Sequence, residues 1–261
     1  MRFFAAGNLN GCKIRAGRLP AVVLISSVLT AAAQVSDPGT PPERGPAAQA
    51  QSSALVSANE LRAPRDAKTA AHLGRMALEQ RRYPDARRHI AHALEIYPEY
   101  ALALQLRGVL NLREQRLEDA CTDFQRATEY DPNLGAAYLA LGATYNRLGH
   151  FQEAAVPLSR AAAILPAAWS VQYEMALAYL GSGKYPAALD AISRAEQNNP
   201  AEPDNRSSVF YTKGRVLLAL NDDQQARAAF EQSIRQEPGG HFAQLSQQQL
   251  DRRLSARDSA K

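Results

Sequence analysis

Small and large apolar residues recur along this chain in fixed columns, separated by polar positions at helical spacing. One column of small residues holds Gly74, Gly108, Gly142, Ala176 and Gly214. A second column holds Ala86, Ala120, Ala154, Ala188 and Ala226, and a third holds the large residues Ile90, Phe124, Leu158, Ile192 and Phe230. A fourth column holds Pro98, Pro132, Pro166, Pro200 and Pro238. Neighbours in each column lie 34 residues apart, except for a last step of 38, so the chain contains five copies of one unit.

Each column has a mechanical meaning in a hairpin of two helices. The two small columns let the helices approach closely, the large apolar column fills the space between them, and proline ends the second helix. The predicted copies are 67–100, 101–134, 135–168, 169–206 and 207–238, followed by a capping helix over 239–256 that carries Phe242, Leu245 and Leu250. Such hairpins bury their apolar faces by stacking on one another. The four extra residues before copy five are expected to loop out or to extend the preceding helix.

The third copy carries the fullest version of the pattern. Its residues Tyr138, Leu141, Gly142, Tyr145, Gly149, Phe151, Ala154, Leu158, Ala161 and Pro166 resemble the tetratricopeptide repeat family. The resemblance spans 67–238 and implies an all-α, right-handed α-solenoid that acts as an interaction scaffold rather than as an enzyme. Copies two and five depart from the family pattern, with Arg107 and Asn111 at usually apolar places and Lys213 at the equivalent of Leu141.

The first 33 residues differ in character from the repeats. Basic residues precede an apolar run over 21–30, and the small residues Ala31, Ala32 and Ala33 follow it. This order is typical of a secretory signal peptide, and the run is shorter than the roughly 20 residues that span a bilayer. We therefore expect 1–33 to be a signal peptide and the protein to be exported, periplasmic or secreted; an uncleaved N-terminal anchor is the alternative. Residues 34–66 are rich in Pro, Ala and Gln and predict a linker.

Charge excludes two classes of partner. The chain has 30 basic and 26 acidic residues, and the predicted signal peptide contains four of the basic residues and no acidic ones. The mature chain is then formally neutral, which gives no footprint for nucleic acid or for an anionic membrane.

The sequence offers little catalytic chemistry. His89, His92 and Glu95 share one helix face, but a metal site needs further ligands, so a solvated helix face is the expectation. Phosphate-binding loops and nucleophile motifs do not occur. We expect no enzyme, no cofactor and no metal. Cys121, beside Ala120, is expected to be a buried small residue; a reactive thiol is the alternative.

The family resemblance also implies a binding surface, because the first helix of each hairpin lines a concave groove in that family. Carried onto this chain, the groove residues are Lys68, Ala71 and Arg75; Gln105, Val109 and Leu112; Leu139, Ala143 and Asn146; Tyr173 and Leu177; Tyr211 and Arg215. The middle of this set is apolar and aromatic, which suits a helix or an extended segment of a protein partner. The alternative is that several of these residues pack against neighbouring helices. Ala71, Leu139 and Ala143 argue against a clamp for a terminal carboxylate.

Two functions follow from these patterns. The first is an exported, non-enzymatic scaffold that binds a protein or peptide in its groove. The alternative is a structural or assembly subunit of an envelope complex, acting through the convex helices or by self-association.

Overall fold

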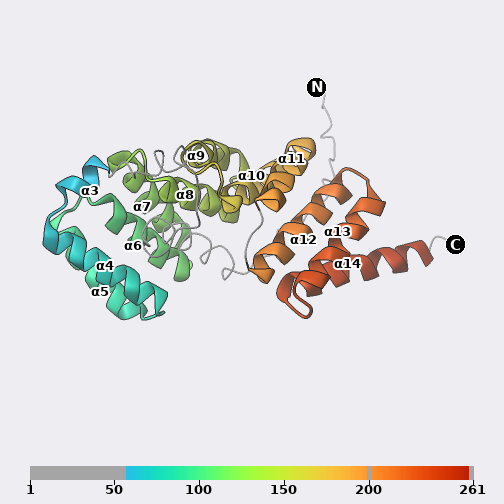
Figure 1. The fold of residues 1–261 in the computed structure, drawn as a ribbon, viewed down its shortest axis with the longest axis horizontal. Helices are drawn as coiled ribbons and strands as arrows, with labels where there is room; N and C mark the ends of the chain where they lie inside the picture. The colour runs from blue at the N-terminus through green and yellow to red at the C-terminus, as the bar shows by residue number, and fades with distance from the viewer. Residues whose placement is uncertain (1–56, 199–201, 259–261) are drawn as a thin grey trace, which may run out of the picture.

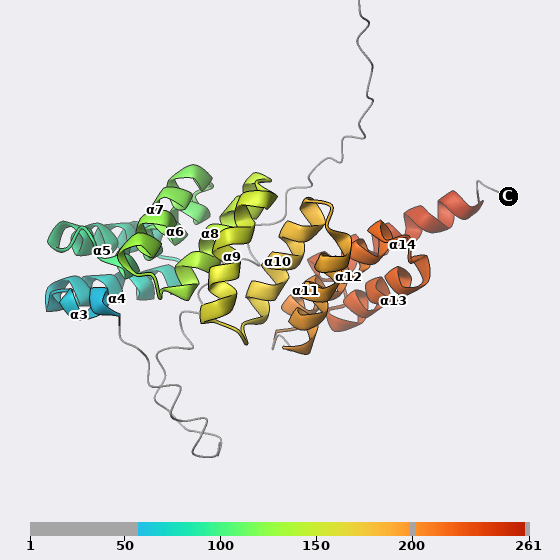
Figure 2. The same ribbon diagram turned by 90° about the horizontal axis from the view of Figure 1, so that it is seen from above.

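The computed structural model describes residues 57–198 and 202–258, and every regular element in these ranges is an α-helix. The helices are α3 (Ala58–Arg62), α4 (Arg65–Glu79), α5 (Tyr83–Ile96), α6 (Ala101–Arg113), α7 (Leu117–Tyr130), α8 (Gly135–Leu148), α9 (Phe151–Ile164), α10 (Trp169–Gly181), α11 (Tyr185–Gln197), α12 (Pro203–Ala219), α13 (Asp223–Gln236) and α14 (His241–Asp258). They stack in one row from α4 to α14 (Figure 1) and lie as successive ribs in the perpendicular view (Figure 2). The predicted all-α solenoid is confirmed. The predicted signal peptide lies outside the described residues, as does 34–56 of the predicted linker.

Each hairpin is closed by contact between a small residue on its first helix and a large one on its second. A Cβ added to Gly108 would lie 2.6 Å from the Phe124 ring, and one added to Gly142 would lie 2.5 Å from Leu158 Cγ. Phe124 and Leu158 have no exposed surface. The helices therefore pack backbone against side chain, as the two columns predicted.

A left-handed residue turns the chain between the two helices of every hairpin. It is Arg81, Gln115, Gly149, Gly183 or Asn221, with φ between 58° and 80°. Glycine adopts this conformation readily, whereas a residue with a Cβ is strained in it. The turn therefore has the same left-handed conformation in all five hairpins, including the three in which the residue is not glycine.

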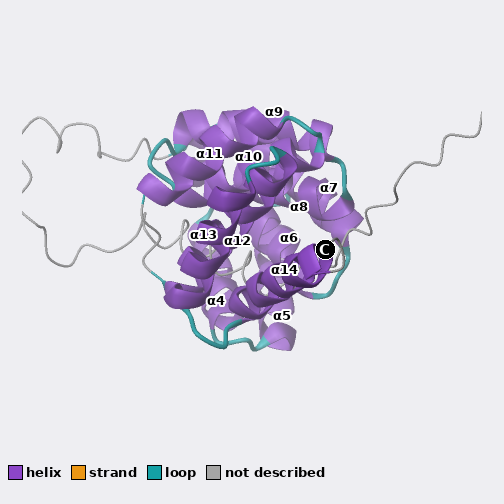
Figure 3. Cartoon of the chain, turned by 90° about the vertical axis from the view of Figure 1, so that its right-hand side faces the viewer, coloured by secondary structure: helices purple, strands orange, loops and turns teal. Residues whose placement is uncertain are grey.

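The first helices of the hairpins also contact one another in series, from α4 through α6, α8 and α10 to α12. Viewed along the long axis, the second helices α5, α7, α9 and α11 lie at the periphery, and α6, α8 and α12 lie nearer the centre (Figure 3). The first helices thus form a continuous inner face. No helix in the described ranges has both the length and the apolar character needed to cross a bilayer.

The N-terminal end of the solenoid is fastened by α3, which falls inside the stretch predicted as linker. The Asn59 side chain accepts a hydrogen bond from the Ala101 backbone N–H (2.9 Å) and donates one to the Glu99 carbonyl (2.7 Å). The Tyr100 hydroxyl donates to Glu60 at 2.8 Å. Residues 57–66 are therefore part of the folded unit rather than linker, because a polar side chain satisfies the backbone where copy two begins.

In the C-terminal half, the start of copy five differs from the sequence-based prediction, whereas the capping helix agrees with it. The four extra residues before copy five extend the following helix rather than the preceding one: α12 begins at Pro203 and has 17 residues. Proline is well suited to this first turn because it lacks only an N–H that would be unpaired there.

At the end of the solenoid, Phe242 of α14 packs on Tyr211, with ring centroids 5.7 Å apart. Leu245 and Leu250 pack on the same cluster, so α14 is the predicted capping helix.

The contact at Gly108 predicts the effect of adding one methyl group. Gly108→Ala places a Cβ against three atoms of the rigid Phe124 ring, at 2.6 to 2.9 Å. We expect a net loss of about 1–2 kcal/mol in the free energy of unfolding, since overpacking outweighs the gain in helix propensity. Urea denaturation measures it.

The matched control is Ala176→Gly, in the same column of copy four. It removes a tolerated methyl group and should destabilise by about 0.5–1 kcal/mol through helix propensity alone. An alanine at position 108 that stabilised the protein would show that the column is not closely packed.

Candidate functional site

The predicted groove residues divide into a buried set and a partly exposed set. Gln105, Val109, Leu112, Leu139, Ala143, Tyr173, Leu177 and Tyr211 are between 1% and 8% exposed, and Ala71 is fully buried. Lys68, Arg75, Asn146 and Arg215 keep part of their surface exposed. The apolar and aromatic members thus pack between hairpins, as in the alternative given above. The surface that remains on the inner face is polar and cationic at these positions.

Tyr173 shows why the aromatic members are buried. Burial raises the pKa of Tyr173 to about 12, and the side chains of Thr212 and Ser208 on α12 act on its hydroxyl to oppose that rise. Its ring also meets Trp169 edge-on, with centroids 5.9 Å apart. Tyr173 therefore joins copies four and five, and a charged substitution there would disrupt packing as well as any binding.

A polar cluster joins the first helices of copies three and four, and sequence reasoning identified only one of its members. Asn146 of α8 donates two hydrogen bonds of 2.9 Å to Glu174 of α10, one to the backbone carbonyl and one to the carboxylate Oε2. The neighbouring Arg147 donates to Gln115 Oε1 at 3.1 Å. The predicted groove residues included Tyr173 and Asn146 but not Glu174 and Arg147. Each of the two missed residues directly follows a predicted one in the sequence.

Glu174 is the buried charge of this cluster. It is 1% exposed, and burial raises the pKa of its carboxyl group from 4.5 to about 7. The Asn146 hydrogen bond and the positive charge of Arg147 oppose that rise. Desolvation disfavours the carboxylate, so the inner face carries a proton-binding group near neutral pH.

A row of cations follows the inner face. Lys68 and Arg75 lie on α4, Arg113 on α6, Arg147 on α8 and Arg215 on α12, all partly exposed. None of these five forms an ion pair within the described residues; Arg75 contacts His72 at 3.0 Å, and Arg215 lies 5.8 Å from the centroid of the Tyr211 ring. Burial lowers the pKa of the Arg113 and Arg147 guanidinium groups. The five cations therefore have no carboxylate at ion-pair distance among the described residues, although the charge of Glu174 acts on Arg147.

Cations on the second helices have a different environment. Arg88, Arg194 and Arg227 each pair with an acidic residue one helical turn away, at 2.9 to 3.2 Å. These exposed pairs contribute little to stability. Arg126 and Arg160, on α7 and α9, lie over tyrosine rings instead, at 6.0 and 5.9 Å from the ring centroids. Pairing within one helix is therefore a feature of some outer cations, and it leaves Arg194 and Arg227 as outer charges for comparison with the inner row.

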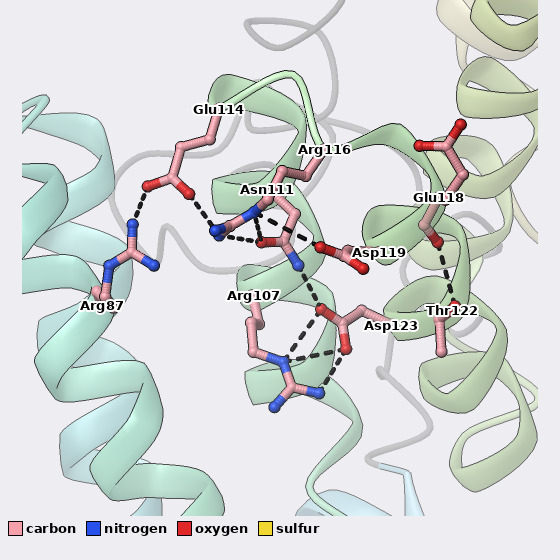
Figure 4. Close-up of polar contacts among 9 residues, drawn as sticks. All are labelled: Arg87, Arg107, Asn111, Glu114, Arg116, Glu118, Asp119, Thr122 and Asp123. Atoms are coloured by element: carbon pink, nitrogen blue, oxygen red, sulfur yellow. Dashed lines mark hydrogen bonds and ion pairs between the residues drawn. The ribbon is translucent and has the colours of Figure 1, made fainter.

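A second polar cluster lies in copy two and occupies the places that are usually apolar (Figure 4). Arg107 Nε donates to both carboxylate oxygens of Asp123 at 3.0 Å, and Asn111 donates to Asp123 Oδ2 at 2.9 Å. Arg116 donates to Asn111 and pairs with Glu114, which also pairs with Arg87 of α5. Arg107 and Asn111 therefore connect α6 to α7 rather than offering an outward contact. Lys213 makes a corresponding ion pair with Glu196 at 2.6 Å.

The remaining candidates from the sequence behave as ordinary helix residues. His92 Nδ1 lies 3.7 Å from Glu95 on an exposed face, and the described residues bring no three His, Cys, Asp or Glu side chains together as a metal site. Cys121 is buried, and burial raises the pKa of its thiol to about 11. A protonated, buried thiol is unreactive, as the first interpretation of Cys121 held.

The Glu174 environment predicts a pH-dependent stability. The pKa of this carboxyl is higher in the folded than in the unfolded protein, so its contribution is complete below about pH 4.5 and is lost as the pH rises through about 7. Glu174→Gln should therefore stabilise the protein by roughly 2–3 kcal/mol at pH 8 and by little at pH 4. Thermal denaturation across this range measures it. Glu118→Gln, on an exposed residue, is the control and should follow the native protein; equal pH profiles for all three proteins would contradict the prediction.

The copy-two cluster predicts an unequal effect of two carboxylates on the same helix. Asp123→Ala leaves Arg107 and Asn111 without their acceptor, with the Asp123 side chain only 5% exposed. We expect a loss of about 2–4 kcal/mol, below the full cost of breaking a buried pair because Arg107 is 40% exposed. Asp119→Ala removes only an exposed contact of 3.6 Å to Arg116 and should change stability by less than about 0.5 kcal/mol. Similar losses for both variants, measured by urea denaturation, would show that Asp123 is not a structural ion pair.

Comparison with known proteins agrees with the repeat geometry. The model of the tetratricopeptide repeat family matches residues 71–133 and 173–241, together just over half of the chain. A search of curated proteins finds no match.

Several solved structures share the architecture. MamA (41-end) from Desulfovibrio magneticus RS-1 is 19% identical, with 69% of this chain and 99% of that chain covered and a TM-score of 0.59. YrrB, described as a repeat protein of this kind with an unusual peptide-binding site, is 17% identical, with coverages of 70% and 92% and a TM-score of 0.57. The pilF protein of Pseudomonas aeruginosa is 20% identical, with coverages of 75% and 87% and a TM-score of 0.61. At these identities the likeness concerns the fold, and together with the family match it leads to one conclusion: the chain belongs to the tetratricopeptide repeat family.

Proposed function

We propose that this protein is a non-enzymatic scaffold that holds a segment of a partner protein on the inner face of its solenoid. The observation that carries the proposal is the row of cations on the first helices, Lys68, Arg75, Arg113, Arg147 and Arg215, none of them in an ion pair within the described residues. Repeat proteins of this family are interaction modules, and that general role supports the proposal.

The chemistry of the row indicates what the partner segment presents. Partly desolvated guanidinium groups gain most from acceptors that replace lost water, namely carboxylates and main-chain carbonyls. The apolar residues first expected to grip the partner are packed between hairpins, so hydrogen bonds and charge carry recognition along this face. We infer a protein segment with acidic side chains or an extended backbone, rather than an apolar helix.

The proposed location is the cell envelope or the outside of the cell. It is supported by the order of basic, apolar and small residues in 1–33, which is typical of a signal peptide. The scaffold would then meet its partner after export.

Action as an assembly subunit through the convex helices has less support. Arg107 and Asn111, the polar residues at usually apolar places, would serve it as outward contacts, and both are instead engaged with Asp123. We therefore favour the inner face.

The proposal predicts a difference between inner and outer charge reversals. Affinity capture from an envelope extract of the source cells would compare the native protein with Lys68→Glu/Arg75→Glu, both partly exposed on α4. The inner variant should lose the partner, at least tenfold in bound amount, because two acceptor-binding cations become repulsive.

The control is Arg194→Glu/Arg227→Glu, which reverses two outer cations with exposed side chains. It should retain the partner. Circular dichroism of each variant establishes that the solenoid is folded. A partner retained by both variants would place recognition outside the α4 part of the inner face and overturn the proposal as stated.

A further inference from the structure

Three buried polar atoms of the cluster between copies three and four have no hydrogen-bond partner: Asn146 Oδ1, Arg147 Nη1 and Glu174 Oε1. Buried polar groups are nearly always paired, because an unpaired one loses its bonds to water without replacement. Three such atoms in one cluster therefore indicate a group that the folded chain does not itself supply.

The two unpaired oxygens belong to side chains that are hydrogen-bonded to each other. Asn146 Nδ2 donates to Glu174 Oε2 at 2.9 Å and also to the Glu174 backbone carbonyl. These two acceptors fix the orientation of the amide, since the reverse orientation would place three oxygens against one another. Asn146 Oδ1 and Glu174 Oε1 thus belong to the two groups that share this hydrogen bond, and both are acceptors.

The unpaired donor is on the next residue. Arg147 uses Nη2 to bind Gln115 of copy two, while its positive charge acts on Glu174 of copy four. The cluster therefore presents two acceptors and one donor, on an inner face shared by three consecutive copies.

This combination selects among possible ligands by elimination. An ammonium or guanidinium group provides donors only and would leave Arg147 unpaired and repelled. A carboxylate provides acceptors only and would be repelled by Glu174. A single main-chain amide has one N–H, which is one donor too few. Among the polar groups of a protein partner, a primary carboxamide has two N–H donors and one carbonyl acceptor, which matches all three atoms. A buried water has the same donors and acceptors, and the probe titration below distinguishes the two, because a site filled by water gives no saturable response to the glutamine probe.

We propose that Asn146, Arg147 and Glu174 form a binding site for the side-chain carboxamide of a glutamine or asparagine in the partner protein. Its two N–H groups donate to Asn146 Oδ1 and Glu174 Oε1, and its carbonyl accepts from Arg147 Nη1. This inference rests on the proposed function, since it assigns one side chain of the segment held on the inner face.

The three unpaired atoms are buried, although Asn146 and Arg147 are partly exposed elsewhere on their side chains, so a ligand enters by displacing one of these two side chains. Arg147 is tethered to Gln115 by a hydrogen bond at the exposed turn between α6 and α7. Moving the guanidinium group aside breaks that solvent-accessible bond, which water replaces readily. Arg147 therefore acts both as a cover and as the donor to the ligand.

The test uses a single residue as probe. N-acetylglutamine N-methylamide is titrated into the full-length chain at pH 8, and the side-chain N–H signals of Asn146 and Arg147 are followed by NMR. We expect saturable shifts with a millimolar dissociation constant. The similarly sized glutamate and methionine probes have no N–H donor in the side chain, and glutamate is also repelled by Glu174, so both should bind at least about tenfold more weakly.

Variants separate recognition from folding. Glu174→Gln replaces the unpaired acceptor by a donor while keeping an oxygen for Asn146, and it should stabilise the fold yet weaken the glutamine probe at least about tenfold. Arg147→Met removes the donor and should also weaken binding of the glutamine probe at least about tenfold. Arg194→Met, which removes a cation on the outer helix α11, is the control and should bind the probe as the native chain does.

Two results would overturn the proposal. One is equal binding of the three probes, and the other is unchanged binding of the glutamine probe to a folded Glu174→Gln variant. Either result, found while the inner charge reversal still abolishes partner capture, would reject the carboxamide site and leave the scaffold function standing. Loss of the probe response alone in Glu174→Gln, with capture unaffected by the inner charge reversal, would support the site and reject the wider cation-row proposal.

Discussion

The close approach of two helices at a column of small residues is the contact on which the rest of the solenoid depends. Gly74, Gly108, Gly142 and Gly214 leave room for one large side chain each, and a Cβ at any of them would lie 2.5 to 2.7 Å from that side chain. This contact sets the spacing within each hairpin. Because the hairpins are nearly identical, it also sets the spacing between them, and a single period propagates along the chain.

Stacking at that spacing explains why so few groove candidates remain on the surface. The first helices contact one another in series, so large side chains such as Tyr173 and Leu139 fill the junction between copies. An interior of this kind has little empty space. Where an apolar residue is missing, an ion pair takes its place: Arg107 with Asp123 in copy two, and Lys213 with Glu196 at the start of copy five. Both keep one partner near solvent, which limits the cost of desolvation.

The inner face consequently consists of the side chains that are not packed between hairpins. Long cationic side chains reach past the junctions and are partly exposed, and the five named above form no ion pair in the part of the chain that the structure describes. Glu174 is the exception, buried beside Asn146 with its ordinary ionisation disfavoured. An interaction surface built from unneutralised cations and a few unpaired polar atoms selects partners by hydrogen bonding and charge rather than by apolar area.

The sequence by itself determined the helices, the hairpins, their number and the capping helix, because each depends on local periodicity and on residues that repeat at 34 positions. It could not determine that α3 fastens the N-terminal end, since that follows from contacts with the start of copy two. Nor did it determine which helix the four extra residues extend. It also selected Tyr173 and Asn146 but not the adjacent Glu174 and Arg147. Which of two neighbouring residues on a helix meets the next hairpin depends on a rotation of about 100° per residue and on the angle between hairpins. Only the tertiary structure fixes that angle, and with it which side chains become core and which remain available to a partner.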